Sequence, residues 1–206
     1  TDGIYCQSSS PALTNNIFRY NNDGVESDDG SSPKIFDNQF KENIRPVMYY
    51  SHKLDSTMYG NTYEDNQKAY IELVGQNYNW DDGDHIWAMD GAPYRLTNHI
   101  HVRANNNSNL LPILRIKSGT TVEVNQNINF YISWDHGNYK GALQAEDVSF
   151  TLGEGDIWNG LRFRSYTEDS ETYLNNCIIE YADNGVYCES SSPTLTNNIF
   201  RYNNDG

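Results

Sequence analysis

The sequence contains no run of about 18 apolar residues, which excludes a transmembrane helix. Basic residues are also scarce: 14 Lys and Arg stand against 28 Asp and Glu, which gives a formal net charge of −14 at pH 7. Nucleic acids and anionic lipid surfaces repel a chain this acidic. We therefore expect no nucleic-acid partner and no insertion into a membrane.

Residues that favour helices are sparse as well. Ala and Leu are few, whereas Asn is abundant and Tyr occurs 16 times in 206 residues. Asn favours turns and Tyr favours strands, so the composition predicts an all-β protein. The length suits one domain with a sizeable core. No secretion signal is visible, but the chain opens in the middle of a pattern, and we expect it to be part of a longer protein.

Cysteine is rare, with three residues, and two of them are the same position of a repeat. Cys6 corresponds to Cys188, so a single repeat unit carries Cys177 and Cys188. A disulfide between Cys177 and Cys188 is one interpretation, and two thiols packed in or beside a wall are the other.

The repeat itself is the most informative feature. Residues 1–24 return as residues 183–206 with five differences, and "SSSPALTNNIFRYNNDG" becomes "SSSPTLTNNIFRYNNDG". We interpret the chain 1–206 as a single segment in which residues 1–182 form one long repeat unit and 183–206 begin the next.

A shorter repeat runs inside the long one. Residues 2–22 and 23–43 both carry Asp-Gly, an apolar residue, Ser-Ser-Pro, another apolar residue and an Asn before an aromatic residue. Each such unit has three short apolar stretches of period two, separated by turn residues. This pattern predicts a three-sided parallel β-solenoid of about seven to eight coils with uncapped ends, because one coil buries its apolar residues only against its neighbours.

Two sets of positions follow from this alignment. We place the first strand of successive coils near Ile4, Val25, Val47, Ile71, Val102, Ile132, Leu161 and Val186. An Asn before the third strand recurs and predicts a ladder of inward amides that bond from coil to coil. The predicted ladder residues are Asn16, Asn38, Asn61, Asn176 and Asn198.

Several motifs resemble a known family. "SSPTLTNNIF", "YGNTYEDN", "LRIKSGTTVEV" and "NNCIIEYADNGVYC" are similar to right-handed parallel β-helix repeat proteins of bacterial cell surfaces, including the NosD-like and pectate-lyase-like folds. The similarity covers nearly the whole chain. It implies the fold and a secreted or surface-attached location, but it supplies no catalytic residue, because no stretch matches an enzyme signature.

Acidic and imidazole side chains are candidate metal ligands. Asp81, Asp82 and Asp84 in "DDGDH" could offer oxygen ligands to calcium, although the EF-hand spacing is absent, and a solvated acidic loop is the simpler interpretation. His99 and His101 lie on one face of a predicted strand, without a visible third ligand. We expect no cofactor, with calcium as the possible exception.

Aromatic and basic side chains are candidate ligand-binding residues. Trp80 and Trp87 fall in a long loop, where their rings could stack on sugars. Arg162 and Arg164 lie on a predicted outward face and could neutralise a uronate, with Asp135 or Asp156 as an acid. A hydrolase would need paired carboxylates, and the pattern fixes no such pair.

The repeat predicts the function. A unit that returns to its own start can stack on itself without a break in register, so the expected partner is another copy, end to end along the axis. We expect a non-enzymatic extracellular or cell-surface fibre, stalk or filament, with surface polysaccharide as a second expected partner. The alternative is a carbohydrate-binding module or a polysaccharide lyase-like enzyme on the same scaffold.

Overall fold

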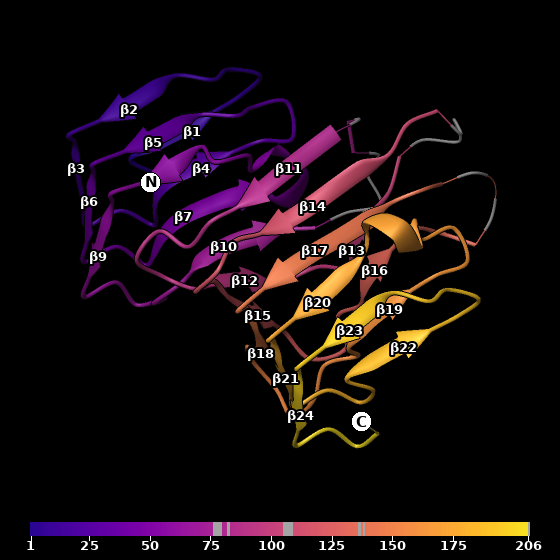
Figure 1. Ribbon diagram of the computed structural model, residues 1–206. Helices are drawn as coiled ribbons and strands as arrows, with labels where there is room; N and C mark the ends of the chain where they lie inside the picture. The colour runs from indigo at the N-terminus through magenta and orange to yellow at the C-terminus, as the bar shows by residue number, and fades with distance from the viewer. Residues whose placement is uncertain (76–79, 82, 105–108, 136, 138, 206) are drawn as a thin grey trace.

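The computed structural model describes residues 1–75, 80–81, 83–104, 109–135, 137 and 139–205. These residues form short β-strands and two single-turn 3-10 helices, η1 (Ser51–Lys53) and η2 (Asp169–Glu171). No helix in the described part is long and apolar enough to cross a membrane. Figure 1 shows the strands of successive coils side by side, from the indigo N-terminal coil to the yellow C-terminal coil.

One sheet, sheet A, extends through the whole stack. Its nine strands, in order, are β1 (Ile4–Cys6), β4 (Asp23–Ser27), β7 (Arg45–Tyr50), β10 (Ile71–Val74), β12 (Tyr94–Leu96), β15 (Thr121–Val124), β18 (Ser149–Leu152), β21 (Ile178–Glu180) and β24 (Ile199–Arg201). Each pair of neighbours in this sheet is parallel.

Two further sheets complete the coils near the N-terminus. Sheet B contains β2 (Ala12–Thr14), β5 (Lys34–Phe36) and β8 (Met58–Tyr59). Sheet C contains β3 (Ile17–Arg19), β6 (Gln39–Lys41) and β9 (Thr62–Glu64). Each of the first coils therefore follows the order A, B, C.

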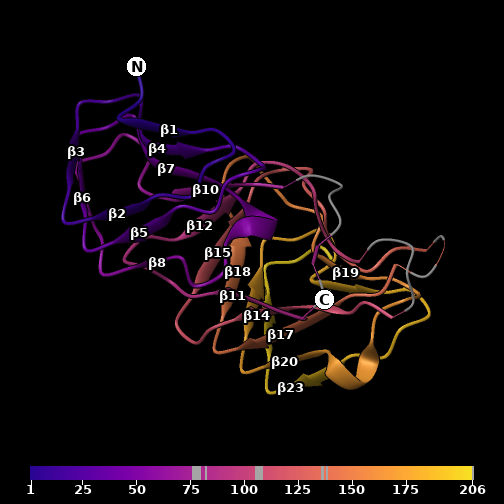
Figure 2. The ribbon, with the colours of Figure 1, turned by 90° about the horizontal axis from the view of Figure 1, so that it is seen from above.

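Two different sheets complete the later coils. Sheet D contains β11 (Gly83–Trp87), β14 (Pro112–Ile116), β17 (Ala142–Glu146), β20 (Tyr173–Asn175) and β23 (Thr194–Thr196). Sheet E contains β13 (Ile100–Val102), β16 (Phe130–Ile132), β19 (Leu161–Phe163) and β22 (Val186–Cys188). The later coils follow the order E, D, A, and the indigo and yellow coils are both three-sided in Figure 2.

The core lies inside the coils and is continuous. Inward residues stack in register along sheet A, where Ile71 pairs with Tyr94 and Tyr94 with Val122. All three side chains are buried. Because a strand exposes alternate residues to opposite faces, this register gives every coil the same apolar lining. The predicted all-β, three-sided parallel solenoid is confirmed.

Sharp turns between the second and third strands keep the coils short. Asn15, Asp37 and Asn197 occupy the left-handed region with φ of 57°, 54° and 55°. Asn and Asp tolerate this conformation better than other non-glycine residues because their short polar side chains bond locally. These turns therefore account for part of the Asn-rich composition.

The predicted first strands are correct for four coils and wrong after them. Ile4, Val25, Val47 and Ile71 follow one another in sheet A, but the next strand of that sheet contains Tyr94. Val102, Ile132, Leu161 and Val186 all belong to sheet E instead. The error has a physical cause. Sheet C ends at β9 and sheet E begins at β13, so the first strand of each later coil belongs to sheet E and no longer to sheet A.

Candidate functional site: the stacking surfaces and the outer wall

Asn16, Asn38 and Asn61 form a hydrogen-bonded column between the second and third walls. The Asn38 Oδ1 accepts bonds from the Asn16 backbone N–H (2.8 Å) and Nδ2 (3.1 Å). The Asn61 Oδ1 accepts the same two bonds from Asn38, at 2.8 and 3.1 Å. The remaining hydrogen of the Asn38 Nδ2 goes to the Leu13 carbonyl at 2.8 Å. Each buried amide therefore joins the coil before it to the coil after it.

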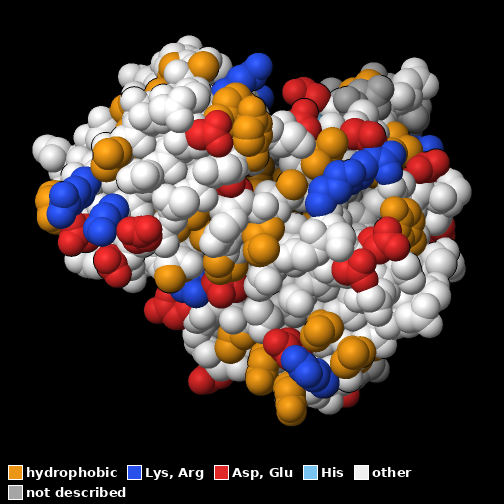
Figure 3. Space-filling view, turned by 60° about the vertical axis from the view of Figure 1, so that its left-hand side comes forward, with side chains coloured by type: hydrophobic (Ala, Val, Ile, Leu, Met, Phe, Trp, Pro, Cys, Tyr) orange, Lys and Arg blue, Asp and Glu red, His pale blue; other side chains and the backbone are white. Residues whose placement is uncertain are grey.

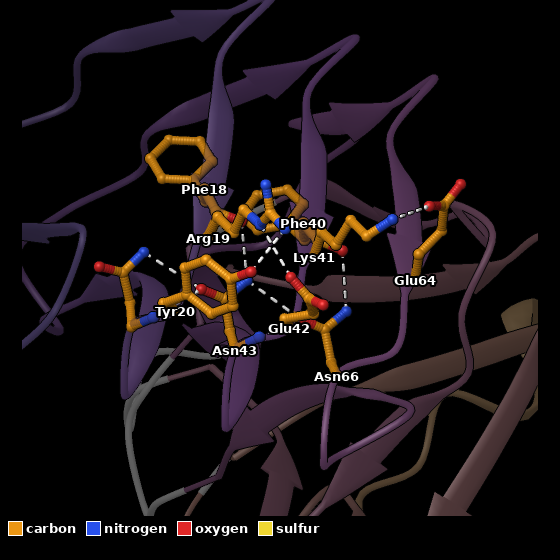
Figure 4. Close-up of polar contacts among 10 residues, drawn as sticks. Phe18, Arg19, Tyr20, Phe40, Lys41, Glu42, Asn43, Glu64 and Asn66 are labelled. Carbon is orange, nitrogen blue, oxygen red and sulfur yellow. Dashed lines mark hydrogen bonds and ion pairs between the residues drawn. The ribbon is translucent and has the colours of Figure 1, made fainter.

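A second column with the same geometry lies five residues further along each coil. Asn21 donates to the Asn43 Oδ1 from its backbone N–H (3.0 Å) and its Nδ2 (3.1 Å), and Asn43 donates to Asn66 in the same way. Figure 4 shows this column beside the outward pairs of Arg19 with Glu42 and Lys41 with Glu64. This second column was not predicted, although the Asn-x-x-x-x-Asn spacing recurs in the sequence.

The predicted column continues differently in the other coils. Asn61 donates to the buried carboxyl of Asp90, which also accepts the Tyr63 hydroxyl at 2.9 Å. Burial raises the pKa of the Asp90 carboxyl. Asn176 is not in the inward position: the register pairs Asn175 with Thr196, so Asn176 lies at the left-handed turn and Cys177 occupies the inward place.

Asn198 and Asn203 make only half of the bonds of an interior Asn. The Asn198 Oδ1 accepts the Cys177 N–H at 2.8 Å, and its Nδ2 donates to the Leu174 carbonyl at 2.9 Å. Asn203 bonds Ala182 and Ile179 in the same way. Among the described residues, neither backbone N–H has an acceptor.

The two copies of the repeated coil thus display complementary halves of one pattern. Asn198 makes the bonds toward the preceding coil, whereas Asn16, the same position of the repeat, makes the bonds toward the following coil. Together they reproduce four of the five bonds that Asn38 makes, and the fifth, from the Nδ2 of the preceding Asn, is absent because Cys177 occupies that place. A coil with both neighbours would therefore leave none of these groups unpaired.

Side-chain burial differs between the copies in the same sense. Leu13 is 7% exposed and Leu195 is 41% exposed, and Phe18 is 6% exposed where Phe200 is 36% exposed. Phe18 is stacked on Phe40 at 4.9 Å between ring centroids. The apolar side chains of β23 and β24 are therefore uncovered on the side away from the preceding coil. The same residues in β2 and β3 are covered by the next coil.

Outward charges also pair from coil to coil. The Arg19 Nε lies 2.8 Å from the Glu42 carboxylate of the next coil, and the Arg201 Nε lies 2.6 Å from the Glu180 carboxylate of the preceding coil. Figure 3 shows acidic and basic side chains next to one another in small groups on one face. Such exposed pairs join neighbouring coils but add little stability.

The three thiols are free. Cys177 is buried in the core, so the structure favours the packed thiol of the two interpretations. Cys6 is buried and Cys188 is exposed, which again separates the covered copy of the repeat from the uncovered one.

The prediction that Trp80 and Trp87 are accessible is wrong. Their side chains are 2% and 0% exposed, and the Trp87 Nε1 donates to the Ser51 carbonyl at 3.2 Å. The segment has the composition of a loop, but Trp87 ends strand β11 with its ring turned inward. Neither ring can stack on a sugar.

The predicted acidic metal ligands do not converge in the described part of the chain. Asp84 lies 2.8 Å from the Arg115 Nε, Asp81 is exposed, and Asp82 lies outside the described residues. The one described group close enough to hold an ion is Asp2, Asp23 and Glu26.

That acidic group has another use. Arg45 contacts the Asp23 carboxylate and lies 2.8 Å from Glu72, so the guanidinium ties together β4, β7 and β10. The second copy of the repeat has Asn184 in place of Asp2. Asp23 and Glu26 therefore belong to an ion-pair network around Arg45.

The outer face of sheet E brings together the predicted basic residues. His101, Tyr131, Arg162 and Tyr187 are in register on four successive strands. The Arg162 guanidinium lies 5.3 Å from the Tyr187 ring centroid, and the structure shows no ion pair of Arg162 with a described residue. Its buried Nε also lacks a hydrogen-bond partner there.

The neighbouring residues of this face are held in place. Arg164 contacts the Asp135 carboxylate and lies 2.9 Å from Glu189, while Asp156 is exposed in a turn elsewhere. The Trp134 ring packs 4.7 Å from His101. Burial, with Arg103 and His99 nearby, lowers the pKa of His101 to about 3, so this imidazole is neutral at pH 7.

Comparisons with known proteins agree with this architecture. A family model described as "Right handed beta helix region" matches residues 2–157, which is more than half of the chain. No curated protein and no solved structure matches the sequence.

Proposed function

The chain belongs to the right-handed β-helix family, and from that premise we propose that it is one period of a tandem array in which coils stack without interruption into an extracellular fibre, stalk or filament. The role is structural and non-enzymatic, and the partner is the next copy of the unit. The observation that carries the proposal is the complementarity of the two repeated coils. Asn16 and Asn198 each make the half of the bonding pattern that the other lacks.

Hydrophobic burial supports the same conclusion. The side chains of Leu195 and Phe200 are exposed in the last coil, while the identical residues Leu13 and Phe18 are buried by residues 23–43. Covering them removes apolar surface from water at about 25 cal/mol per Å². The coil that covers them in a tandem array would be residues 23–43 of the following unit.

Amide hydrogen exchange tests the proposal. The 206-residue chain is compared with a chain of two consecutive units, in which residues 183–206 of the first unit serve as the first coil of the second. We expect the Asn198 and Asn203 amides to exchange at least about tenfold more slowly in the two-unit chain, because a tenfold change corresponds to the net value of about one hydrogen bond.

A matched variant identifies the acceptors. Asn38→Ala in the second unit removes the acceptor for Asn198 and leaves Asn43, the acceptor for Asn203, intact. Protection should then be lost at Asn198 and retained at Asn203. Equal exchange rates in the one-unit and two-unit chains would refute the array.

A second candidate function is binding of an acidic carbohydrate along the outer face of sheet E. Arg162 favours it, because this cation has no carboxylate partner among the described residues of an acidic protein. A sugar carboxylate would pair with Arg162, and the sugar ring would pack on Tyr187, which is 39% exposed. The residues at hand suggest binding and supply no paired carboxylates for hydrolysis.

Titration with matched oligosaccharides tests this second function. We expect a uronic-acid oligomer to bind at least about tenfold more tightly than a neutral hexose oligomer of equal length, with weakening at high salt. Arg162→Gln should abolish the difference, while Arg115→Gln, which alters an outward Arg already paired with Asp84, should preserve it. Equal affinities for the two oligomers would exclude the site.

A further inference from the structure

The two copies of the repeated coil lie in different sheets. In the first copy β1, β2 and β3 belong to sheets A, B and C, whereas the equivalent β22, β23 and β24 belong to sheets E, D and A. A pure translation along the stack would return every strand to its own sheet. Sheet A is instead the first wall of the coil at one end and the third wall of the coil at the other.

The exchange of walls occurs between β9 and β13. Beyond β10, the Trp80 N–H donates at 2.8 Å to the carbonyl of Arg103, the residue that follows the first strand of sheet E. Sheet C has no strand beyond β9 in the described chain. Sheet D follows sheet B more directly, since the Ser56 N–H donates to the Ile86 carbonyl at 3.0 Å. One wall therefore ends and one begins in each unit, while sheet A continues and sheet D takes over from sheet B.

We propose that the last coil docks on residues 23–43 of a following copy, so that sheet E continues as sheet A of that copy, sheet D as sheet B, and sheet A as sheet C. The inference rests on the proposed tandem array and specifies its register. Each unit is then offset from the one before it by one wall, in addition to the rise along the stack.

The contacts of the first coil specify which residues meet. Arg19 pairs in register with Lys41, and Phe18 pairs with Phe40. The equivalent residues Arg201 and Phe200 therefore lie on Lys41 and Phe40 of the following copy. A slip of two residues along the same wall, which keeps each side chain on its own face, would instead place Arg201 on Gln39 of that copy.

Paired cysteines in the two-unit chain distinguish these registers. Neighbouring Cα atoms on adjacent strands lie about 4.8 Å apart, within the range that a disulfide spans. One variant carries Arg201→Cys with Lys41→Cys in the second unit. The other carries Arg201→Cys with Gln39→Cys in the second unit. Mass spectrometry of the digested, oxidised protein reads which pair is joined.

The outcomes separate this inference from the array itself. We expect the Lys41→Cys pair, which joins sheet A of the first unit to sheet C of the second, to cross-link and the Gln39→Cys pair to remain reduced. Cross-linking of the Gln39→Cys pair alone would mean a slipped register, which overturns the proposed residue pairing and leaves the array standing. Failure of both pairs overturns the register, and unprotected Asn198 and Asn203 amides in the same chain would overturn the array as well.

Discussion

At the scale of single residues, asparagine performs two tasks that the composition alone does not distinguish. Asn15 supplies a left-handed turn, and its neighbour Asn16 supplies an inward amide that joins coils. The Asn-Asn pair in "TNNIF" therefore combines a conformational requirement with a bonding requirement. Asn176 shows why the sequence alone misassigns one column position: it is an Asn at the turn, and the inward place next to it is taken by Cys177.

Loss of an interior amide should cost more than loss of a terminal one. Asn38→Ala removes the partner of the Leu13 carbonyl, the acceptor of the Asn16 N–H and Nδ2, and one of the two donors to the Asn61 Oδ1. We expect a loss of about 2–4 kcal/mol in the free energy of unfolding, because buried groups are left unpaired. Asn16→Ala, which removes only the Nδ2 bond to the Asn38 Oδ1, should cost about 1 kcal/mol. Urea denaturation measures both, and equal losses would contradict the directional column.

Asp90 should make the stability of the N-terminal coils depend on pH. Burial raises its folded-state pKa above the ordinary value of 3.8, so its contribution is present at low pH and is lost as the pH rises through the folded-state pKa. Asp90→Asn keeps an acceptor for Asn61 without a buried charge. We expect the variant to be about 1 kcal/mol more stable than the parent at pH 7.

The difference between the parent and Asp90→Asn should vanish below about pH 3.8, where the carboxyl is neutral in both the folded and the unfolded chain. Thermal unfolding at pH 7 and pH 3 measures the comparison. A difference that is constant across that range would refute the assignment.

At the scale of strands and sheets, the local pattern predicted the architecture but not the exchange of walls. Period-two alternation identifies a strand such as Leu161–Phe163, yet it does not say which sheet the strand joins. That choice depends on contacts with the coil before and the coil after, which are far apart in sequence. Trp87 was wrongly predicted to be accessible for the same reason. Its burial depends on its place in the fold, near the point where sheet E begins, and the local sequence does not show this.

A glycine at the start of β19 tests how closely the coils approach. Gly160 has φ of +88°, and a Cβ there would lie 1.6 Å from the Asn184 carbonyl oxygen of the repeated coil. Gly119 has a similar φ of +80° with open space around it. We expect Gly160→Ala to destabilise the protein by at least about 2 kcal/mol more than Gly119→Ala. Equal melting temperatures for the two variants would contradict the close contact.

At the scale of the whole molecule, the chain is a stack whose two ends are unequal copies. Cys6 is buried and Cys188 is exposed although both occupy the same position of the repeat. The coil of Cys6 is covered by the following coil, whereas the coil of Cys188 contacts only the preceding one. The sequence predicted the repetition and the stacking. It did not predict which side of each terminal coil is uncovered, because that depends on the three-dimensional contacts.

The cost of truncating Phe200 should depend on the number of units. In the 206-residue chain its ring is 36% exposed, so Phe200→Ala should cost about 1 kcal/mol, well below the core value. In the two-unit chain the ring would be covered like Phe18, and the cost should rise to about 3 kcal/mol. Hydrogen exchange of the neighbouring amides reports this local loss, and an unchanged cost would show that the ring stays in water.

The orientation of the amide columns has a consequence for any polymer of this unit. In Asn38 the backbone N–H points to the later coil and the Oδ1 receives from the earlier one, and Asn43 repeats that sense. Parallel strands preserve it over the whole length. Such a polymer has a head and a tail with different chemistry, so elongation, attachment and severing would each distinguish one tip from the other.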